Sequence, residues 1–149
     1  MRRIVSLFTA AALAACYGGG ERAGEGAEAG AAATISLADV AGKWTVQSMA
    51  EGSDSVLVTS ELNATATTEG WTTVLPGRDP ISQHVVVGGD SVVMHAGPFE
   101  SVLRPGVQVT TESSFRLVNG MLEGWTVAHY QGAGADSVLR MRTRGTRAP

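Results

Sequence analysis

The stretch VQVTTESSFRLVNGMLEGWTVAHY, residues 107–130, carries the clearest local signal in the chain. Asn119 and Gly120 both tolerate the positive φ that a tight two-residue hairpin turn needs. Apolar and polar residues alternate on both sides of this turn, which is the pattern of strands with one face in a core and the other in water. The stretch therefore predicts a β-hairpin with strands at 107–118 and 121–130.

The same two-residue period continues from Lys43 to the end of the chain, without sustained helical periodicity. Segments rich in Gly, Asp, Asn and Pro separate nearly every pair of apolar runs and predict turns. The expected strands are 43–49, 56–65, 71–75, 81–87, 91–95, 107–118, 121–130 and 138–144. Because short turns join consecutive strands, we expect an all-β domain in which about eight strands form a single antiparallel up-and-down meander.

Three segments nearly repeat: GSDSVLV from Gly52, GGDSVVM from Gly88 and GADSVLR from Gly134. A catalytic serine needs a general base within hydrogen-bond reach and donors for an oxyanion, and three interchangeable copies cannot all have them. In each copy the glycine suits a turn and the aspartate can accept hydrogen bonds from turn amides. We interpret the repeats as hairpin turns, and expect no catalytic residue and no enzymatic activity.

A meander of this length leaves two unpaired edges, which natural proteins remove by closing a barrel or by folding into a two-sheet sandwich. We favour a closed or nearly closed barrel, with a β-sandwich as the alternative. An eight-stranded barrel is wide enough to be filled by side chains or to hold one small ligand.

The inner wall is expected to be apolar but interrupted by hydroxyl groups. Odd-numbered residues from 107 to 117 are Val, Val, Thr, Ser, Phe and Leu, whereas several even-numbered ones are charged or polar. In the next strand we expect the odd-numbered Met121, Trp125 and Val127 to face inward as well. Small polar residues inside a barrel indicate buried water or a pocket.

The segment before the first strand suggests how the barrel is closed at one end. SLAD, residues 36–39, suits one short helical turn, and AGKWTV follows it. This order resembles the start of lipocalin-type barrels, whose first strand carries G-x-W, here Gly42-Lys43-Trp44. The resemblance implies that Trp44 plugs the closed end and that a basic residue of the last strand, Arg142 or Arg144, stacks across it.

Strand parity makes that stack difficult, because Arg142 and Arg144 face outward if Leu139 and Met141 face inward. The stack would then need a β-bulge. The alternative is an arginine stripe exposed to solvent on the outer face of the last strand.

The N-terminal segment predicts export. Met1-Arg2-Arg3 is positive, an apolar run too short to span a bilayer follows, and the run ends in Leu-Ala-Ala-Cys16. This resembles the lipobox of bacterial lipoproteins, whose cysteine is lipidated and becomes the mature N-terminus. It implies a signal peptide at 1–15, a lipidated Cys16 with a flexible Gly/Ala/Glu linker to residue 35, and a barrel domain at 36–149. An ordinary signal peptide with a chance cysteine is the alternative.

The resemblance also implies a location. Tyr17, and not Asp, follows the cysteine, which resembles the pattern sorted to the outer membrane, facing the periplasm. The membrane would be contacted through the lipid anchor. A net charge of −3 argues against nucleic acid as a partner, and the single cysteine excludes an internal disulfide.

His84, His95 and His129 are the only histidines, and each falls in a different expected strand. Imidazoles from separate strands can bind zinc, but none of the three lies in a His-x-His or His-Glu pair. We favour one buried histidine and two exposed ones, and expect no metal and no cofactor.

The segment HAGPFESVLRPGV, residues 95–107, is the longest expected connection, and it serves either as a binding lid or as a loop packed over the barrel mouth. We expect Trp71, Phe99, Leu103 and Trp125 near a site for a small apolar or amphipathic ligand. The alternative is a structural or protein-interaction module of the envelope, with a filled barrel, no ligand and an unidentified protein partner.

Overall fold

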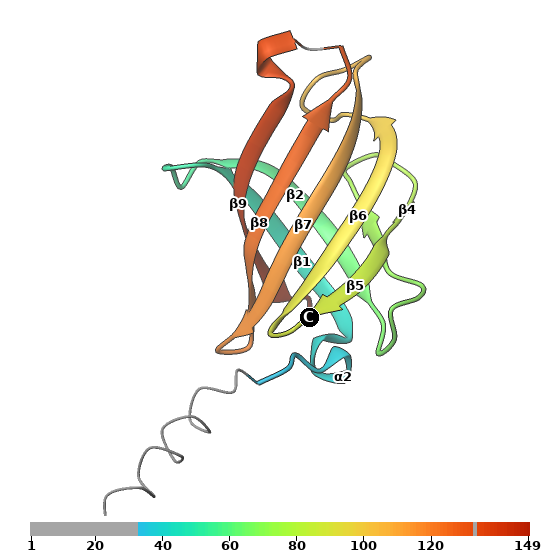
Figure 1. The fold of residues 1–149 in the computed structure, drawn as a ribbon, viewed down its shortest axis with the longest axis vertical. Coiled ribbons are helices and arrows are strands. Elements are labelled where there is room, and N and C mark those ends of the chain that lie inside the picture. The colour runs from blue at the N-terminus through green and yellow to red at the C-terminus, as the bar shows by residue number, and fades with distance from the viewer. Residues whose placement is uncertain (1–32, 133) are drawn as a thin grey trace, which may run out of the picture. The chain divides into compact units, whose positions relative to one another are not determined.

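Nine antiparallel strands form a single sheet in the computed structural model (Figure 1). The structure describes residues 33–132 and 134–149, so the expected signal peptide, Cys16 and the linker as far as residue 32 lie outside the described residues. Within these two ranges no helix combines the length and the apolar character that a membrane span requires. The elements in chain order are α2 (Leu37–Val40), β1 (Gly42–Ala50), β2 (Val56–Ala64), β3 (Thr72–Val74), β4 (Ile81–Ser82), β5 (His84–Gly88), β6 (Ser91–Glu100), β7 (Gln108–Val118), β8 (Met121–Tyr130), the 3-10 turn η1 (Gly134–Asp136) and β9 (Val138–Arg147).

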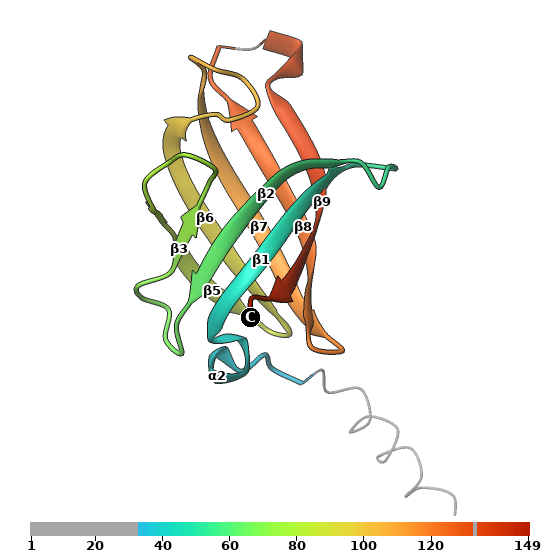
Figure 2. The ribbon, with the colours of Figure 1, turned by 180° about the vertical axis from the view of Figure 1, so that it is seen from behind.

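The strand order is β4-β3-β2-β1-β9-β8-β7-β6-β5, which curls into a nearly closed barrel (Figures 1 and 2). The first and last long strands pair with each other, from Trp44 opposite Arg147 to Ala50 opposite Met141. Every neighbouring pair is antiparallel, and the other pairs follow chain order. The expected up-and-down meander and its closure into a barrel are therefore confirmed.

One seam in the barrel wall is unsealed, and it divides the strand expected at 81–87. β4 pairs with β3 and β5 pairs with β6, with only Gln83 between the two edge strands. The backbone amide of Gln83 donates to the backbone carbonyl of Trp71 at 2.9 Å. Beside the seam, Arg78 and Glu100 form an ion pair at 3.6 Å. Because of this division the sheet has nine strands instead of about eight.

The Asn-Gly turn determines which residues of β8 face the interior. Its two-residue length pairs Val118 with Met121, so odd-numbered residues of β7 lie opposite even-numbered residues of β8. Phe115 and the other odd residues of β7 face inward, and even residues of β8 therefore do the same. The expectation that Met121, Trp125 and Val127 face inward is wrong, and Trp125 lies on the outer wall with 38% of its surface exposed.

The end of the barrel nearest α2 is sealed by a buried tryptophan and a cation. Trp44 is 0% exposed, and its indole nitrogen donates to the Val40 carbonyl at 2.8 Å. The Arg147 guanidinium lies 4.3 Å from the centre of the Trp44 ring. It also donates to the carbonyls of Ala41, at 3.0 Å, and Asp39. Arg147 thus joins the last strand to α2 across the plug.

The stacking cation is Arg147, and the expectation of Arg142 or Arg144 is wrong. β9 continues three residues beyond its expected end, and Arg147 has the inward parity of Met141. No bulge in β9 is needed. Arg142 and Arg144 face outward, where they pair with Asp54 and with Glu123, the latter at 3.7 Å.

Position 42, at the sealed end, suits only glycine, because a side chain there would meet Arg147. Its φ is +135°, and a Cβ built on it would lie 2.9 Å from Nη1 of Arg147. The G-x-W segment therefore supplies two things at one place: space for the guanidinium from Gly42 and the aromatic face beneath it from Trp44.

We expect Arg147→Ala to lower the free energy of unfolding by about 1–3 kcal/mol, since it removes a cation–π contact and charge-assisted hydrogen bonds. Arg144→Ala is the matched control on the same strand, and loses only an exposed ion pair worth about 0–1 kcal/mol. Urea unfolding of both variants measures the difference. Equal losses in the two variants would contradict this account of the seal.

Candidate functional site

The barrel interior is layered, with hydroxyl groups between two apolar clusters. The cluster at the sealed end surrounds Trp44, and the cluster at the open end surrounds Tyr130. The sealed-end cluster contains Val40, Trp44, Val46, Leu62, Ala64, Trp71, Val85, Val92, Met94, Phe115 and Leu122, and the open-end cluster contains Val109, Ala128, Tyr130 and Met141.

Four hydroxyls from four neighbouring strands form a hydrogen-bonded row, which we call the hydroxyl row: Ser48 (β1), Thr143 (β9), Thr126 (β8) and Ser113 (β7). The oxygen atoms are 3.5 Å apart for Ser48 and Thr143, 3.1 Å for Thr143 and Thr126, and 2.8 Å for Thr126 and Ser113. All four residues are buried, Thr143 with 1% of its surface exposed. A buried hydroxyl without a partner costs about 1–3 kcal/mol, so these groups are stable here because they satisfy one another.

A β-bulge turns Phe99 toward the mouth of the barrel. Between the pairs Ala96–Thr111 and Phe99–Val109, β6 has one residue more than β7. The extra residue reverses the parity of β6, which places the odd-numbered Phe99 among the inward-facing residues. The expected connection at 95–107 is therefore shorter than predicted, because its first half continues β6 to Glu100.

The remaining connection folds over the mouth and is held there by Ser101. Ser101 is 3% exposed, and its hydroxyl accepts hydrogen bonds from the amides of Leu103 and Arg104, each at 3.1 Å. Its own amide donates to the Val107 carbonyl at 2.9 Å. Leu103 then packs on the open-end cluster. This connection covers part of the mouth, as one of the two sequence interpretations expects.

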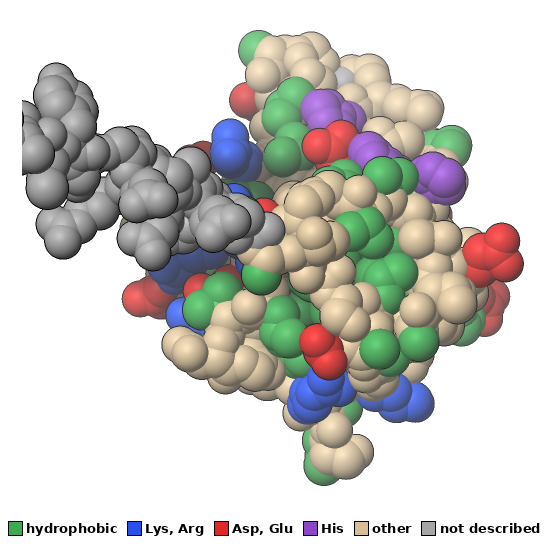
Figure 3. Space-filling model, turned by 60° about the horizontal axis from the view of Figure 1, so that its bottom comes forward, with side chains coloured by type: hydrophobic (Ala, Val, Ile, Leu, Met, Phe, Trp, Pro, Cys, Tyr) green, Lys and Arg blue, Asp and Glu red, His purple; other side chains and the backbone are tan. Residues whose placement is uncertain are grey.

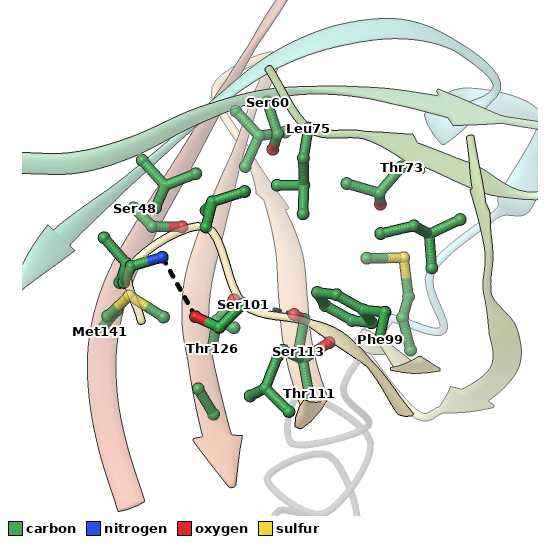
Figure 4. A pocket seen from close by; sticks show the side chains of 18 of the residues that line it. Ser48, Ser60, Thr73, Leu75, Phe99, Ser101, Thr111, Ser113, Thr126 and Met141 are labelled. Carbon is green, nitrogen blue, oxygen red and sulfur yellow. Dashed lines mark hydrogen bonds between the residues drawn. The ribbon is translucent and has the colours of Figure 1, made fainter. Parts of the chain in front are cut away.

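A cavity of about 100 Å³ lies between this cover and the hydroxyl row (Figure 4). Its apolar walls come from both clusters, and seven of its lining residues are serine or threonine. No charged side chain is among the described residues that line it. The lining residues labelled in Figure 4 are Ser48, Ser60, Thr73, Leu75, Phe99, Ser101, Thr111, Ser113, Thr126 and Met141.

Two of the four residues expected at a ligand site line this cavity. Phe99 and Leu103 do so from the mouth. Trp71 is 1% exposed in the sealed-end cluster, where its indole donates to the Thr67 carbonyl at 2.6 Å. Trp125 is on the outer wall, with the Arg140 guanidinium 4.9 Å from its ring centre. The expectation that all four lie at one site is therefore wrong.

A cation lies at the mouth without lining the cavity. The Arg104 guanidinium is 4.0 Å from the ring centre of Tyr130, a cavity residue, and donates to the Asp136 carbonyl at 2.8 Å. Both contacts hold the cover connection against the end of β8 and the η1 turn that follows it. Arg104 thus has a structural role at the open end.

All three histidines lie on the outer wall and are exposed to solvent (Figure 3), so the expectation of one buried histidine is wrong. The rings of His84 and His95 are 6.4 Å apart, and Nδ1 of His95 is 3.6 Å from a Glu112 carboxylate oxygen. In residues 33–132 and 134–149, no group of three or more His, Cys, Asp or Glu side chains is arranged to hold a metal ion.

The sequence alone does not predict the hydroxyl row, although two of its four residues belong to the β7–β8 hairpin. Ser113 was expected inside, and the two-residue turn places its partner Thr126 inside as well. Ser48 and Thr143 are opposite each other only because β1 pairs with β9, which no local pattern indicates.

Comparison of the chain with protein-family models, with curated proteins and with solved structures finds no match.

Proposed function

We propose that this protein is a lipid-anchored binding protein of the bacterial envelope, whose barrel holds a small apolar or amphipathic molecule. The observation that supports it best is the cavity, apolar on its walls and polar at its centre, beneath a cover that includes Phe99 and Leu103. Ligand sites of this kind combine an apolar lining with a few placed polar groups. The role is binding, and the proposal includes no reaction.

The size of the cavity limits the ligand. Most sites for drug-sized molecules measure about 300–1,000 Å³, and this cavity measures about 100 Å³. A molecule with a short alkyl chain or a single small ring suits the volume better than a sterol or a complete phospholipid. The ligand would enter past the cover, since Trp44 and Arg147 close the other end.

We also propose a relationship to lipocalin-type barrels. It is supported by the short helix before β1, by Gly42 and Trp44 in the first strand, and by Arg147 of the last strand stacked on Trp44. The G-x-W resemblance in the sequence implies a basic residue of the last strand on Trp44, and this stack is the structural support for the relationship.

Filling the cavity tests the binding proposal. Ala128 is buried and lines the cavity, so Ala128→Leu should lower the affinity for short-chain alcohols such as 1-hexanol at least tenfold, because the leucine side chain occupies the space. Val127→Leu, on the outer wall of the same strand, is the control and should bind normally. None of Trp44, Trp71 and Trp125 lines the cavity, so tryptophan fluorescence would report binding poorly. Isothermal titration calorimetry is therefore the suitable measurement. Unchanged binding by the Ala128→Leu variant would show that the ligand is elsewhere.

The anchor is tested separately. Expressed in a double-membraned bacterium, the protein should fractionate with the outer membrane and incorporate a palmitate analogue. Cys16→Ala should abolish labelling and release the protein from membranes. Tyr17→Asp should keep the label and move the protein to the inner membrane. Labelling that persists in the Cys16→Ala variant would exclude Cys16 as the acylated residue.

The second candidate is a protein-interaction module, which the small cavity volume favours. Val56, Leu57 and Val138 are large apolar residues exposed at the end of the barrel far from α2. A photo-crosslinker at position 57 should then capture one defined envelope protein, whereas the same group at Val86, exposed on β5, should not. Equal crosslinking at both positions would count against this module.

A further inference from the structure

The hydroxyl row has one hydrogen to donate into the cavity. Each hydroxyl carries one hydrogen and two acceptor lone pairs. Thr143 donates to Thr126, so its own hydrogen is used and Ser48 must be the donor to Thr143. Thr126 and Ser113 share one hydrogen bond in which either oxygen can be the donor, so this bond uses one of the two hydrogens of the pair. Among the described residues no acceptor takes the other hydrogen, which belongs to Ser113 or to Thr126, and both residues line the cavity.

The row also keeps more acceptor capacity than donor capacity. Four hydroxyls have eight lone pairs in total, and three hydrogen bonds occupy about three of them. Ser48, Thr126 and Ser113 line the cavity, and Thr143 lies behind them. A ligand hydroxyl at this place can accept the free hydrogen of Ser113 or Thr126 and donate to a lone pair of the row. A ligand carbonyl can only accept that hydrogen.

The lining disfavours a charged group at the same place. Burying a carboxylate without a cation is costly, because the lost hydration is not replaced. No charged side chain is among the described residues that line the cavity, and Arg104 at the mouth is already held by Tyr130 and the Asp136 carbonyl. Ser60, Thr73 and Thr111 add further neutral hydroxyls to the lining.

We propose that the hydroxyl row selects an uncharged amphiphile, bound with its hydroxyl or carbonyl group at Ser113 and Thr126 and its apolar part against the barrel wall. This assignment rests on the proposed binding function and specifies its ligand class. A neutral alcohol, ester or amide with a short apolar part fits, whereas an ionised fatty acid does not.

Three matched probes test the assignment by titration calorimetry at pH 8, where a carboxylic acid is ionised. They are 1-hexanol, heptane, in which a methyl group replaces the hydroxyl, and hexanoate. We expect 1-hexanol to bind at least tenfold more tightly than hexanoate and measurably more tightly than heptane. Hexanoate binding as tightly as 1-hexanol would overturn the assignment while leaving the binding function in place. Absence of binding by all three would overturn both.

Variants locate the effect on the row. Thr126→Val keeps the shape of the side chain and removes its hydrogen bonds, and should reduce the preference for 1-hexanol over heptane about fivefold or more. Ser113→Ala should do the same and serves if Thr126→Val does not fold. Ser114→Ala, one residue along β7 and facing outward, is the control and should retain the preference. A preference that survives both row variants would show that the row does not contact the ligand.

Discussion

The pairing of β1 with β9 is the contact on which the other features of this structure depend. It joins strands nearly a hundred residues apart in the chain, along seven residue pairs from Trp44–Arg147 to Ala50–Met141. Without it the meander would be an open sheet, and its inner face would lie in water. Closure excludes water from that face, which makes the apolar clusters favourable and requires every enclosed polar group to find a partner.

The hydroxyl row follows from that requirement. Residues directly opposite each other on one face of an antiparallel pair are close enough for short side chains to bond, and Ser48–Thr143 is such a pair. Thr126 joins it to Ser113, its direct partner on β7. The interior therefore combines rigidity, from two packed clusters, with hydrogen-bonding capacity at a single level. The proposed binding role depends on that combination.

The seal and the mouth divide the barrel into two ends with different roles. At one end, Arg147 contacts the Trp44 ring and two carbonyls at the C-terminal end of α2, so opening this end would break several contacts together. At the other, the connection after β6 is held by the hydroxyl of Ser101, by the packing of Leu103 and by the contacts of Arg104 with Tyr130 and the Asp136 carbonyl. The cavity lies beneath this second end, between the cover connection and the hydroxyl row.

Several features were accessible from local sequence alone. The period of two, the Asn119-Gly120 turn and the turn residues between apolar runs were enough to predict the meander. The turn also determines the parity of β8, so the outward position of Trp125 follows from the register that the turn sets. Hydroxyls inside the barrel could be expected from the alternation in β7, of which Ser113 is part.

By itself, then, the sequence determined the strands, their order and the faces of the hairpin, because turn chemistry and alternation act between near neighbours. Only the tertiary structure decided which cation stacks on Trp44, because that depends on how far β9 runs beside β1. It also decided that a bulge turns Phe99 inward and that the strand after Ile81 divides at the seam. The tertiary structure also decided the volume of the cavity, because that volume is the space left between side chains from strands that are distant in the sequence.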